Sequence, residues 1–564
     1  MIVLDGVGAV FDGAREALFA GVDLTLDEGE LVVVAGPTGA GKSTLLATLN
    51  GLFPHTTGGT LLGRVVVGGR DTRTHHPREL ADLVGWVGQD PAAGFVTDSV
   101  EDELAYGMEC LGVAPAAMRA RVEHLLDLLG IAELRRRPLD TLSGGQAQRV
   151  AIGAALAAGP RVLVLDEATS ALDPTAAEDV LAALTRLVHD LGHTVVLAEH
   201  RLERVVQHAD RVVLVPGAGA AVRIGDAAAV LAGSVVAPPV LRLAALAGWV
   251  PPPLSVRDAR RVAGPLRARL GDGPSPAPSG QEFPGRSATH PGPGPGPLAT
   301  LRSVHLAHGA TPALVGVDLS FTAGTVTALM GRNGAGKSSL LAVLAGLVRP
   351  RAGRVRVRLP GEDDVAAIDP ARARPADALR RVGLVPQDPG HLLYADSVAA
   401  ECAAADRDLR LRPGSTRDRL EELAAGIPGD RHPRDLSEGQ RLCLALAVVA
   451  AARPTLLLLD EPTRGLDQPA KEVLARIVAE LAGSGHAVVL ATHDVELAAE
   501  VADRVLLLAD GAVVVDGPAT QVLTGSPVFA PQVARILAPA RWLTVGAVAD
   551  ALASRPVDVG AGAR

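Results

Sequence analysis

A short glycine-rich pattern constrains this chain most, because it occurs twice, with Lys42 and Lys337 standing 295 residues apart. Residues 36–44 read GPTGAGKST and residues 331–339 read GRNGAGKSS, and both fit the pattern G-x-x-x-x-G-K-[ST]. Each copy follows an apolar run typical of a buried strand and opens a stretch typical of a helix. Strand, glycine loop and helix predict a phosphate-binding loop, because backbone N–H groups and a helix N-terminus both favour an anion.

Lysine usage strengthens this interpretation. The chain has 54 Lys and Arg residues but only three lysines, and two of them, Lys42 and Lys337, lie in the two loops. A compact ammonium on a flexible stem is not replaced there by a planar guanidinium. We therefore predict that both loops bind a nucleoside triphosphate, through Gly36, Pro37, Thr38, Gly39, Ala40, Gly41, Lys42, Ser43 and Thr44 and through Gly331, Arg332, Asn333, Gly334, Ala335, Gly336, Lys337, Ser338 and Ser339.

Composition and charge exclude several other classes. A net charge of −9 argues against a general nucleic-acid surface. The cysteines Cys110, Cys402 and Cys443 lack metal-ligand spacing, and we interpret them as apolar packing residues in a reducing compartment. The first residues do not resemble a signal peptide, and the longest apolar run, residues 442–452, is shorter than the ~20 residues that span a bilayer. We expect a cytosolic protein with any membrane role supplied by a partner.

The chain is a tandem repeat. Asp166 and Asp460 lie 294 residues apart and His200 and His493 lie 293 apart, so nearly one offset recurs along each half. The segment between the halves is rich in proline and glycine and has no apolar period, which predicts a flexible linker. The predicted divisions are residues 1–215 (first nucleotide-binding domain), 216–270 (its C-terminal appendage), 271–297 (linker), 298–510 (second domain) and 511–564 (second appendage).

Within each half, short apolar runs alternate with helical patterns. Residues 84–88, 161–166 and 194–198 read as strands in the first half, and residues 384–385, 455–460 and 488–491 in the second. Such alternation predicts an α/β fold with a parallel sheet covered on both faces.

Further motifs make the chain resemble the ABC ATPases. LSGGQ at 142–146 and LSEGQ at 436–440 are each followed by an apolar strand that ends in Asp-Glu, and then by a histidine after one more strand. The resemblance implies two P-loop NTPase domains, each with a parallel-sheet core and a helical subdomain, that hydrolyse ATP to ADP and phosphate with Mg²⁺. The cofactors it implies are therefore ATP and Mg²⁺.

The resemblance also implies roles for single residues. Glu167 and Glu461 would be the general bases, and His200 and His493 would contact the γ-phosphate. The Mg²⁺ ligands implied are Ser43, Gln89 and Asp166 in the first half and Ser338, Gln387 and Asp460 in the second. Phe11 and His308 stand where the family places an aromatic against adenine, although a solvated loop histidine is an equal interpretation of His308.

In this family two domains meet head to tail, so each ATP contacts one domain's phosphate loop and the other domain's signature. The signature residues are Ser143, Gly145 and Gln146 in one half and Ser437, Gly439 and Gln440 in the other. Both halves keep base and histidine, which implies two hydrolytic sites. Glu438 in place of a glycine, and Ala168 where the second half has Pro462, depart from strict symmetry and predict unequal rates.

The segments after Gln89 and Gln387 resemble those of energy-coupling factor (ECF) ATPases. That resemblance implies a peripheral protein on the cytoplasmic face of the cell membrane. Its partners would be a transmembrane coupling protein and a substrate-binding membrane subunit, for uptake of a vitamin or metal ion. The sequence FVTDSV at residues 95–100 favours an ECF system of the hydroxymethylpyrimidine or thiamine type over one of the cobalt type. Residues 91–96 and 389–394 would then contact the partner.

Two alternatives remain open. One is a fused ATPase of a sugar or peptide importer, although such fusions often carry one degraded site. The other is a tandem ABC translation factor acting on the ribosome, which would need a long charged helical linker where this chain has proline and glycine. A DNA-repair ABC ATPase is excluded by the absence of zinc-type cysteine pairs. The transported solute does not follow from these residues.

Overall fold

The computed structural model describes the chain except for residues 15, 171, 218, 272–295, 364 and 555–564. The described chain divides into two compact units: unit 1 comprises residues 1–259 with 467–469, and unit 2 comprises residues 260–466 with 470–564. The division falls at Ala259, inside the segment 216–270. The predicted linker, residues 271–297, lies almost entirely outside the described residues.

The core of unit 1 is a six-stranded sheet in which the four neighbouring pairs from β6 to β9 run parallel and β10 pairs antiparallel with β9. Every residue of its three central strands is buried, as expected for a parallel sheet covered on both faces. The strands, in sheet order, are β10 (Arg223–Gly225), β9 (Arg211–Leu214), β3 (Leu31–Ala35), β8 (Thr194–Ala198), β7 (Val162–Asp166) and β6 (Val84–Val87).

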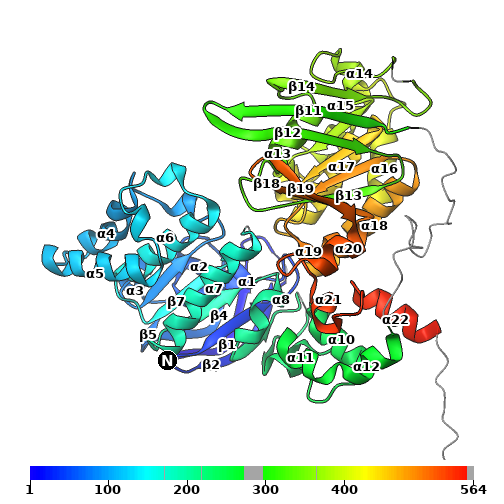
Figure 1. The fold of residues 1–564 in the computed structure, drawn as a ribbon. Coiled ribbons are helices and arrows are strands. Elements are labelled where there is room, and N and C mark those ends of the chain that lie inside the picture. Colours follow the sequence, from blue (N-terminus) through cyan, green and yellow to red (C-terminus); the bar gives the residue numbers. More distant parts are fainter. Residues whose placement is uncertain (15, 171, 218, 272–295, 364, 555–564) are drawn as a thin grey trace, which may run out of the picture. The chain divides into compact units, whose positions relative to one another are not determined.

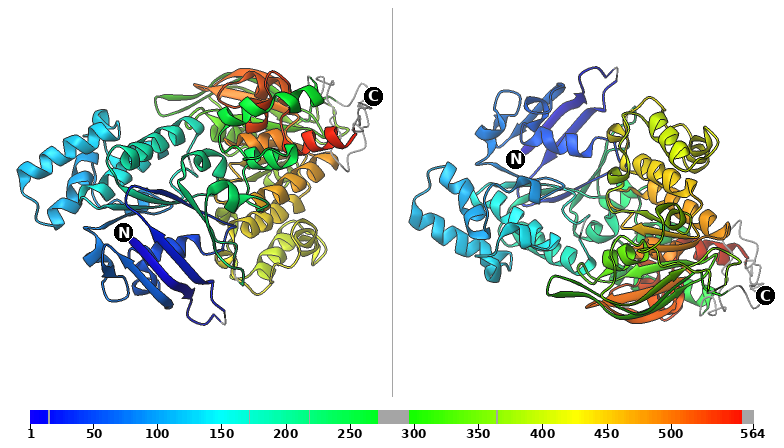
Figure 2. Two further views of the ribbon diagram at one scale, coloured as in Figure 1. Left: turned by 90° about the horizontal axis from the view of Figure 1, so that it is seen from below. Right: turned by 90° about the horizontal axis from the view of Figure 1, so that it is seen from above.

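The helices of unit 1 follow these strands in sequence. Figure 2 shows the cyan helices of the segment 100–130 extending away from the strands of this unit. The α-helices are α1 (Lys42–Leu49), α2 (Leu52–His55), α3 (Pro77–Leu80), α4 (Val100–Cys110), α5 (Pro115–Leu128), α6 (Gly144–Ala157), α7 (Pro174–His189), α8 (Leu202–Val205), α9 (Ala227–Leu231), α10 (Pro239–Ala247) and α11 (Val256–Val262), the last of which crosses the division between the units.

Unit 2 repeats this architecture (Figure 1). Its central sheet has the order β15 (Val382–Val385), β16 (Leu456–Asp460), β17 (Ala487–Ala491), β13 (Val326–Met330), β18 (Arg504–Ala509) and β19 (Ala512–Pro518), again with one antiparallel strand at the edge. Its helices are α12 (Gly264–Leu270), α13 (Lys337–Leu344), α14 (Pro375–Leu379), α15 (Val398–Asp408), α16 (Ser415–Leu423), α17 (Glu438–Ala451), α18 (Gln468–Gly483), α19 (Val495–Val501), α20 (Ala519–Gly525), α21 (Gln532–Leu537) and α22 (Val545–Ser554).

Each unit also contains an antiparallel sheet that the strand patterns did not predict. In unit 1 it consists of β2 (Phe19–Leu26), β1 (Ile2–Val10), β4 (Thr60–Val67) and β5 (Arg70–Asp71), and in unit 2 of β12 (Thr311–Phe321), β11 (Ala299–His308) and β14 (Ala352–Val357). Its inward residues join the core under the phosphate loop: Ile2 and Leu4 belong to one apolar cluster with Leu46 of α1. This sheet therefore supports the strand and helix that flank the loop.

The α/β fold with parallel-sheet cores is confirmed, and strand bounds were predicted closely. The predicted strand at residues 194–198 is β8 with the same bounds. The apolar runs that precede the two phosphate loops, residues 31–35 and 326–330, are β3 and β13. The cysteine prediction was wrong at one position: Cys402 and Cys443 are buried, but Cys110 is exposed because it lies in the last turn of α4. Among the described residues, no helix has both the length and the apolar character that a bilayer crossing requires.

Candidate functional site

Both glycine-rich segments form loops between a buried strand and a helix, as predicted. Gly36 follows β3 with φ 151°, and a Cβ at this residue would lie 2.1 Å from the carbonyl oxygen of Val215. Gly331 follows β13 with φ 149°, and its Cβ would lie 2.4 Å from the carbonyl oxygen of Leu508. Backbone conformation and space both exclude a side chain there, so the loop passes close against the sheet edge and ends at the N-terminus of α1 or α13.

The two loop lysines are buried and point back over their own loops. Lys42 Nζ donates to the carbonyl oxygens of Gly36 and Pro37, each at 3.0 Å, and Lys337 Nζ donates to Gly331 O at 2.9 Å. Burial lowers the pKa of Lys42, while the charges of Glu167 and Asp166 oppose that shift. Each ammonium is thus held where phosphate oxygens could replace the loop carbonyls as its partners.

An aspartate ends the strand beside each loop. Asp166 closes β7 and accepts a hydrogen bond from Ser43, and burial raises the pKa of its carboxyl to about 6. Asp460 closes β16 and accepts from Ser338, and burial raises its pKa as well. In both residues, Oδ1 is buried without a hydrogen-bond partner among the described residues. A buried carboxylate oxygen beside a serine hydroxyl fits a hard cation such as Mg²⁺, whose ligands are oxygens.

The next residue, Glu167, lies in a hydrogen-bonded group in unit 1. His200 Nε2 lies 2.9 Å from Glu167 Oε1, and Gln89 Nε2 donates to the same oxygen at 3.1 Å. Burial opposes ionisation of Glu167, but the hydrogen bond and charge of His200 outweigh it and hold its pKa below the usual value. The predicted base, histidine and glutamine of unit 1 are therefore brought together.

Unit 2 brings together the corresponding base and histidine with different contacts. His493 Nδ1 lies 2.6 Å from Glu461 Oε2, and Lys337 Nζ lies 3.7 Å from Glu461 Oε1. Gln387 and its counterpart Gln89 are both exposed. The two units thus use the same residue types at equivalent positions and bond them differently.

Both candidate bases have a left-handed backbone. The φ angle is 56° at Glu167 and 47° at Glu461, a region that residues with a Cβ rarely adopt. Such a conformation costs on the order of 1 kcal/mol and is concentrated at functional sites. Its occurrence at both equivalent glutamates is consistent with a side chain placed for chemistry.

The two signature segments form helix N-termini. Ser143 caps α6: its Oγ accepts from Gln146 N at 3.4 Å, and Gln146 Oε1 accepts from Ser143 N at 3.0 Å. Ser437 and Gln440 form the same reciprocal pair at α17. A Cβ on Gly145 would lie 2.7 Å from Ala176 Cβ, so this glycine allows α6 to approach α7 closely, and Gly439 faces Ala470 similarly. The contacts that the structure gives these residues are structural, and their contact with nucleotide stays a prediction.

The departure at Glu438 is also a helix-end feature. Glu438 is the first residue of α17, where a carboxylate is favoured by the helix dipole, and it pairs with Arg441 at 2.8 Å. The first unit has Gly144 at this place.

The two predicted adenine-stacking residues differ in availability. Phe11 is 40% exposed and forms an edge-to-face pair with buried Phe53, with ring centroids 5.6 Å apart. His308 ends β11, and its Nε2 lies 3.1 Å from the hydroxyl of Ser339 in the phosphate loop. Stacking by either ring stays a prediction.

The sequence patterns missed the buried groups behind each histidine. Glu199 is fully buried and accepts from Thr169 N at 3.2 Å and from the backbone N–H groups of His200 at 2.9 Å and Arg201 at 3.2 Å. In unit 2 the third lysine, Lys471, forms a buried ion pair with Asp494 at 2.7 Å. The only available signal was an acidic residue next to each histidine, which by itself does not indicate burial.

Comparisons with known proteins agree with this geometry. The family described as ABC transporter matches residues 19–170 and 314–464. An ABC transporter ATP-binding protein of Streptomyces coelicolor is 59% identical over 98% of this chain and 100% of its own length, and one of Streptomyces avermitilis is 58% identical with the same coverage. A solved structure of ribosome-bound archaeal Pelota and ABCE1 is similar in fold, with a TM-score of 0.61 and 19% identity over 92% of this chain and 79% of that one.

The family match covers more than half of the chain and includes both phosphate loops and both Asp-Glu pairs. The full-length relatives match both halves together. The chain therefore belongs to the ABC transporter family, as a tandem ATP-binding protein and ATPase with two P-loop NTPase domains.

Proposed function

We propose that this chain is the ATPase subunit of an ECF-type importer for a vitamin or metal ion. It would act at the cytoplasmic face of the cell membrane, docked on a transmembrane coupling protein that carries a substrate-binding subunit. The proposal is based on the loops that follow Gln89 and Gln387. In each loop, hydrogen bonds fix the backbone while an apolar or aromatic side chain remains exposed.

In unit 1 a buried glutamate holds this loop. Glu103 of α4 is 5% exposed, and its Oε2 accepts from Val96 N at 3.0 Å, from Thr97 N at 2.9 Å and from Thr97 Oγ1 at 2.9 Å. Three donors on one oxygen fix the loop against the helix. The side chain of Val96 nevertheless remains 63% exposed.

Unit 2 has the same arrangement. Glu401 of α15 is 6% exposed, and its Oε2 accepts from Tyr394 N at 2.8 Å and from Ala395 N at 2.7 Å. Tyr394 is 85% exposed. An aromatic side chain presented to solvent on a backbone that a buried carboxylate holds is suited to contact with a partner, since tyrosine is enriched at interfaces.

This arrangement favours a loop that binds apolar helices of a membrane protein over a loop with a purely structural role. A backbone that is ordered before binding loses little conformational entropy on association, and exposed aromatic and branched side chains then supply contact area. The predicted contact segments 91–96 and 389–394 contain Val96 and Tyr394.

Within this function we propose two composite ATP sites. One would combine Lys42, Ser43, Glu167 and His200 with Ser437, Gly439 and Gln440, and the other Lys337, Ser338, Glu461 and His493 with Ser143, Gly145 and Gln146. Bound Mg²⁺ would neutralise charge on the transferring phosphate, held by Ser43 and Asp166 with Gln89, and by Ser338 and Asp460 with Gln387. The buried Oδ1 atoms of Asp166 and Asp460 support that assignment.

The alternative of a ribosome-acting factor rests on fold likeness alone, at 19% identity. The relatives that are 58–59% identical are named as transporter ATP-binding proteins, which favours transport. A sugar or peptide importer shares the ATPase chemistry and differs in its membrane partner. The same experiment separates all three.

The test is affinity purification of the full chain from detergent-solubilised membranes, followed by mass spectrometry. We expect a multi-span coupling protein and a small substrate-binding membrane subunit to copurify. Val96→Asp and Tyr394→Asp should each reduce that recovery at least tenfold, because a carboxylate opposes burial in an apolar contact.

Matched controls are Val235→Asp and Leu347→Asp, which place the same charge at apolar residues that are 66% and 71% exposed elsewhere. They should leave recovery unchanged. Ribosomal proteins without a membrane partner would contradict the transport proposal. Equal losses in test and control variants would contradict the assignment of the docking loops.

A further inference from the structure

Unit 2 contains a cavity at the edge of its central sheet opposite the phosphate loop. Its lining residues include Arg380, Arg453 and His486. They lie before the first residues of β15, β16 and β17 respectively, each within three residues of its strand. These strands run parallel to one another and to β13, whose carboxyl end leads into the phosphate loop. The cavity therefore lies at the amino ends of the strands, about 16 Å from the nucleotide edge for strands of five residues.

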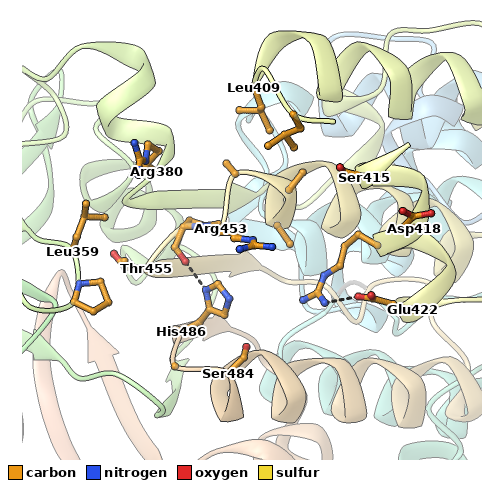
Figure 3. Close-up of a pocket in the computed structure, with 18 residues that line it drawn as sticks. Leu359, Arg380, Leu409, Ser415, Asp418, Glu422, Arg453, Thr455, Ser484 and His486 are labelled. Atoms are coloured by element: carbon orange, nitrogen blue, oxygen red, sulfur yellow. Dashed lines mark hydrogen bonds and ion pairs between the residues drawn. The ribbon is translucent and has the colours of Figure 1, made fainter. Parts of the chain in front are cut away.

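The cavity has a volume of about 1060 Å³, which is large enough for a small organic ligand. One part of its wall is apolar and consists of Leu359, Pro360, Leu409, Leu411 and the end of α17 at residues 450–452. Figure 3 shows Arg453 reaching into the cavity, with Arg380 on one side and Asp418 and Glu422 on the other.

The carboxylates of the lining are already paired. Glu422 accepts from Arg419 at 2.8 Å, and Asp418 pairs with Arg412 at 2.8 Å. Arg380 and Arg453 line the cavity and are exposed to solvent, and no described residue of unit 2 forms an ion pair with either side chain. Positive charge therefore remains in the cavity, next to an apolar wall.

The backbone conformation at Arg453 also distinguishes this cavity from the equivalent region of unit 1. Arg453 has φ 51°, a left-handed conformation, whereas the equivalent residue of unit 1 is Gly159 with φ 79°. The surroundings are otherwise alike, because Pro160 bonds His193 in unit 1 as Pro454 bonds His486 in unit 2. Unit 2 thus carries an arginine where the backbone favours glycine, and at Arg453, unlike Arg410, this conformation coincides with a place in the cavity lining.

His486 adds a polar group with a defined tautomer. Its Nδ1 donates to the carbonyl oxygen of Pro454, which can only accept. Burial lowers the pKa of this histidine, so the neutral ring presents Nε2 as an acceptor. The cavity thus offers two guanidinium groups, one ring acceptor and an apolar surface.

We propose that this cavity is a binding site for a small organic anion with an apolar body, separate from the two ATP sites. Arg380 and Arg453 bind the anionic group, and Leu359, Leu409 and Leu411 contact the body. A phosphate or a carboxylate could supply the charge, since guanidinium groups pair with both.

The test is titration of the purified full chain with 1-naphthyl phosphate, 1-naphthoate and neutral 1-naphthol. The phosphate loops are the same in wild type and variant, so the difference between the two isolates the cavity. We expect wild type to bind one more equivalent of an anionic probe than Arg453→Gly or Arg380→Gln, each of which weakens that equivalent about tenfold or more. Preference for the phosphate or the carboxylate probe identifies the anion, and 1-naphthol should bind at least tenfold more weakly.

The control is Arg410→Gly, which removes another left-handed arginine, with φ 54°, that does not line the cavity. It should leave binding unchanged, and Arg453→Gly should keep or raise the melting temperature. A second measurement uses unaltered protein: phenylglyoxal should modify Arg380 and Arg453, and the anionic probe should protect both but not Arg410. Equal binding by wild type and Arg453→Gly, or no protection at Arg453, would overturn the proposal.

Discussion

The two candidate catalytic centres carry the same motifs but connect the candidate base to different neighbours. In unit 1, Glu167 Oε1 contacts His200 Nε2 at 2.9 Å and Gln89 Nε2 at 3.1 Å. In unit 2, Glu461 contacts His493 through Nδ1 at 2.6 Å, and the loop ammonium of Lys337 lies 3.7 Å away. A loop ammonium acts on both bases, since the charge of Lys42 also lowers the pKa of Glu167, so the two centres differ in the histidine nitrogen used and in the bond from Gln89.

The support behind each histidine differs as well. Unit 1 uses a buried carboxylate, Glu199, that accepts from neutral donors on Thr169, His200 and Arg201. Unit 2 uses the buried ion pair of Lys471 with Asp494. Residues between the motifs therefore set the environment of each centre, although the motifs themselves repeat.

The largest expected effect concerns the bases. Glu167→Gln should lower steady-state ATPase activity at least tenfold, Glu461→Gln by no more than about a tenth, and the double variant about 1000-fold, because amides cannot accept the proton of the attacking water. The measurement is phosphate release by the full chain at saturating ATP. Retained binding of a non-hydrolysable ATP analogue serves as the control for folding, and equal losses in the single variants would contradict unequal centres.

The second prediction concerns the buried ion pair of Lys471 with Asp494 in unit 2. Lys471→Met leaves the carboxylate of Asp494 buried without its cation and should destabilise unit 2 by about 3 kcal/mol. The loss should appear in scanning calorimetry as a lower melting temperature.

Adding Asp494→Asn should recover part of that loss. Asparagine is neutral and can still accept from Leu497 N, which Asp494 Oδ1 now bonds at 3.1 Å as the cap of α19. If the double variant melts at or below the single variant, the ion pair is not what stabilises this region.

The smallest expected effect on ATPase activity comes from replacing the two glutamines, Gln89 and Gln387. Gln89→Ala removes the bond to Glu167 and should lower ATPase activity about fivefold, the equivalent of one hydrogen bond of about 1 kcal/mol. Gln387→Ala should change it less than twofold, because unit 2 contributes the smaller share of the activity. Measured without membrane partner, a larger effect of Gln387→Ala would reverse our assignment of the more active centre.

Much of the fold could be predicted because its signals are local. The strands β3, β8 and β13 are short, wholly buried runs, and the loops after β3 and β13 need glycine for steric reasons that the sequence pattern records. Asp166, Glu167 and His200 could be placed together because parallel strands bring their carboxyl ends to one edge.

The remaining features depend on partners distant in sequence. The antiparallel sheets were missed because the pattern of β2 alternates irregularly and its pairing with β1 shifts register twice. Glu103 and Glu401 resemble ordinary acidic residues in a first helical turn, and only the folded loop shows that they hold Val96 and Tyr394 in place. The choice of Nε2 at His200 and Nδ1 at His493 has no sequence signal.

The burial of the lysines has a practical consequence for labelling. Lys42, Lys337 and Lys471 are 5%, 6% and 8% exposed, and the chain has no other lysine. Amine-directed dyes, crosslinkers and lysine-specific proteases thus find no lysine on the folded surface. In a protein with this composition, reaction of a lysine side chain reports that a phosphate loop, or the buried ion pair of Lys471 with Asp494, has opened.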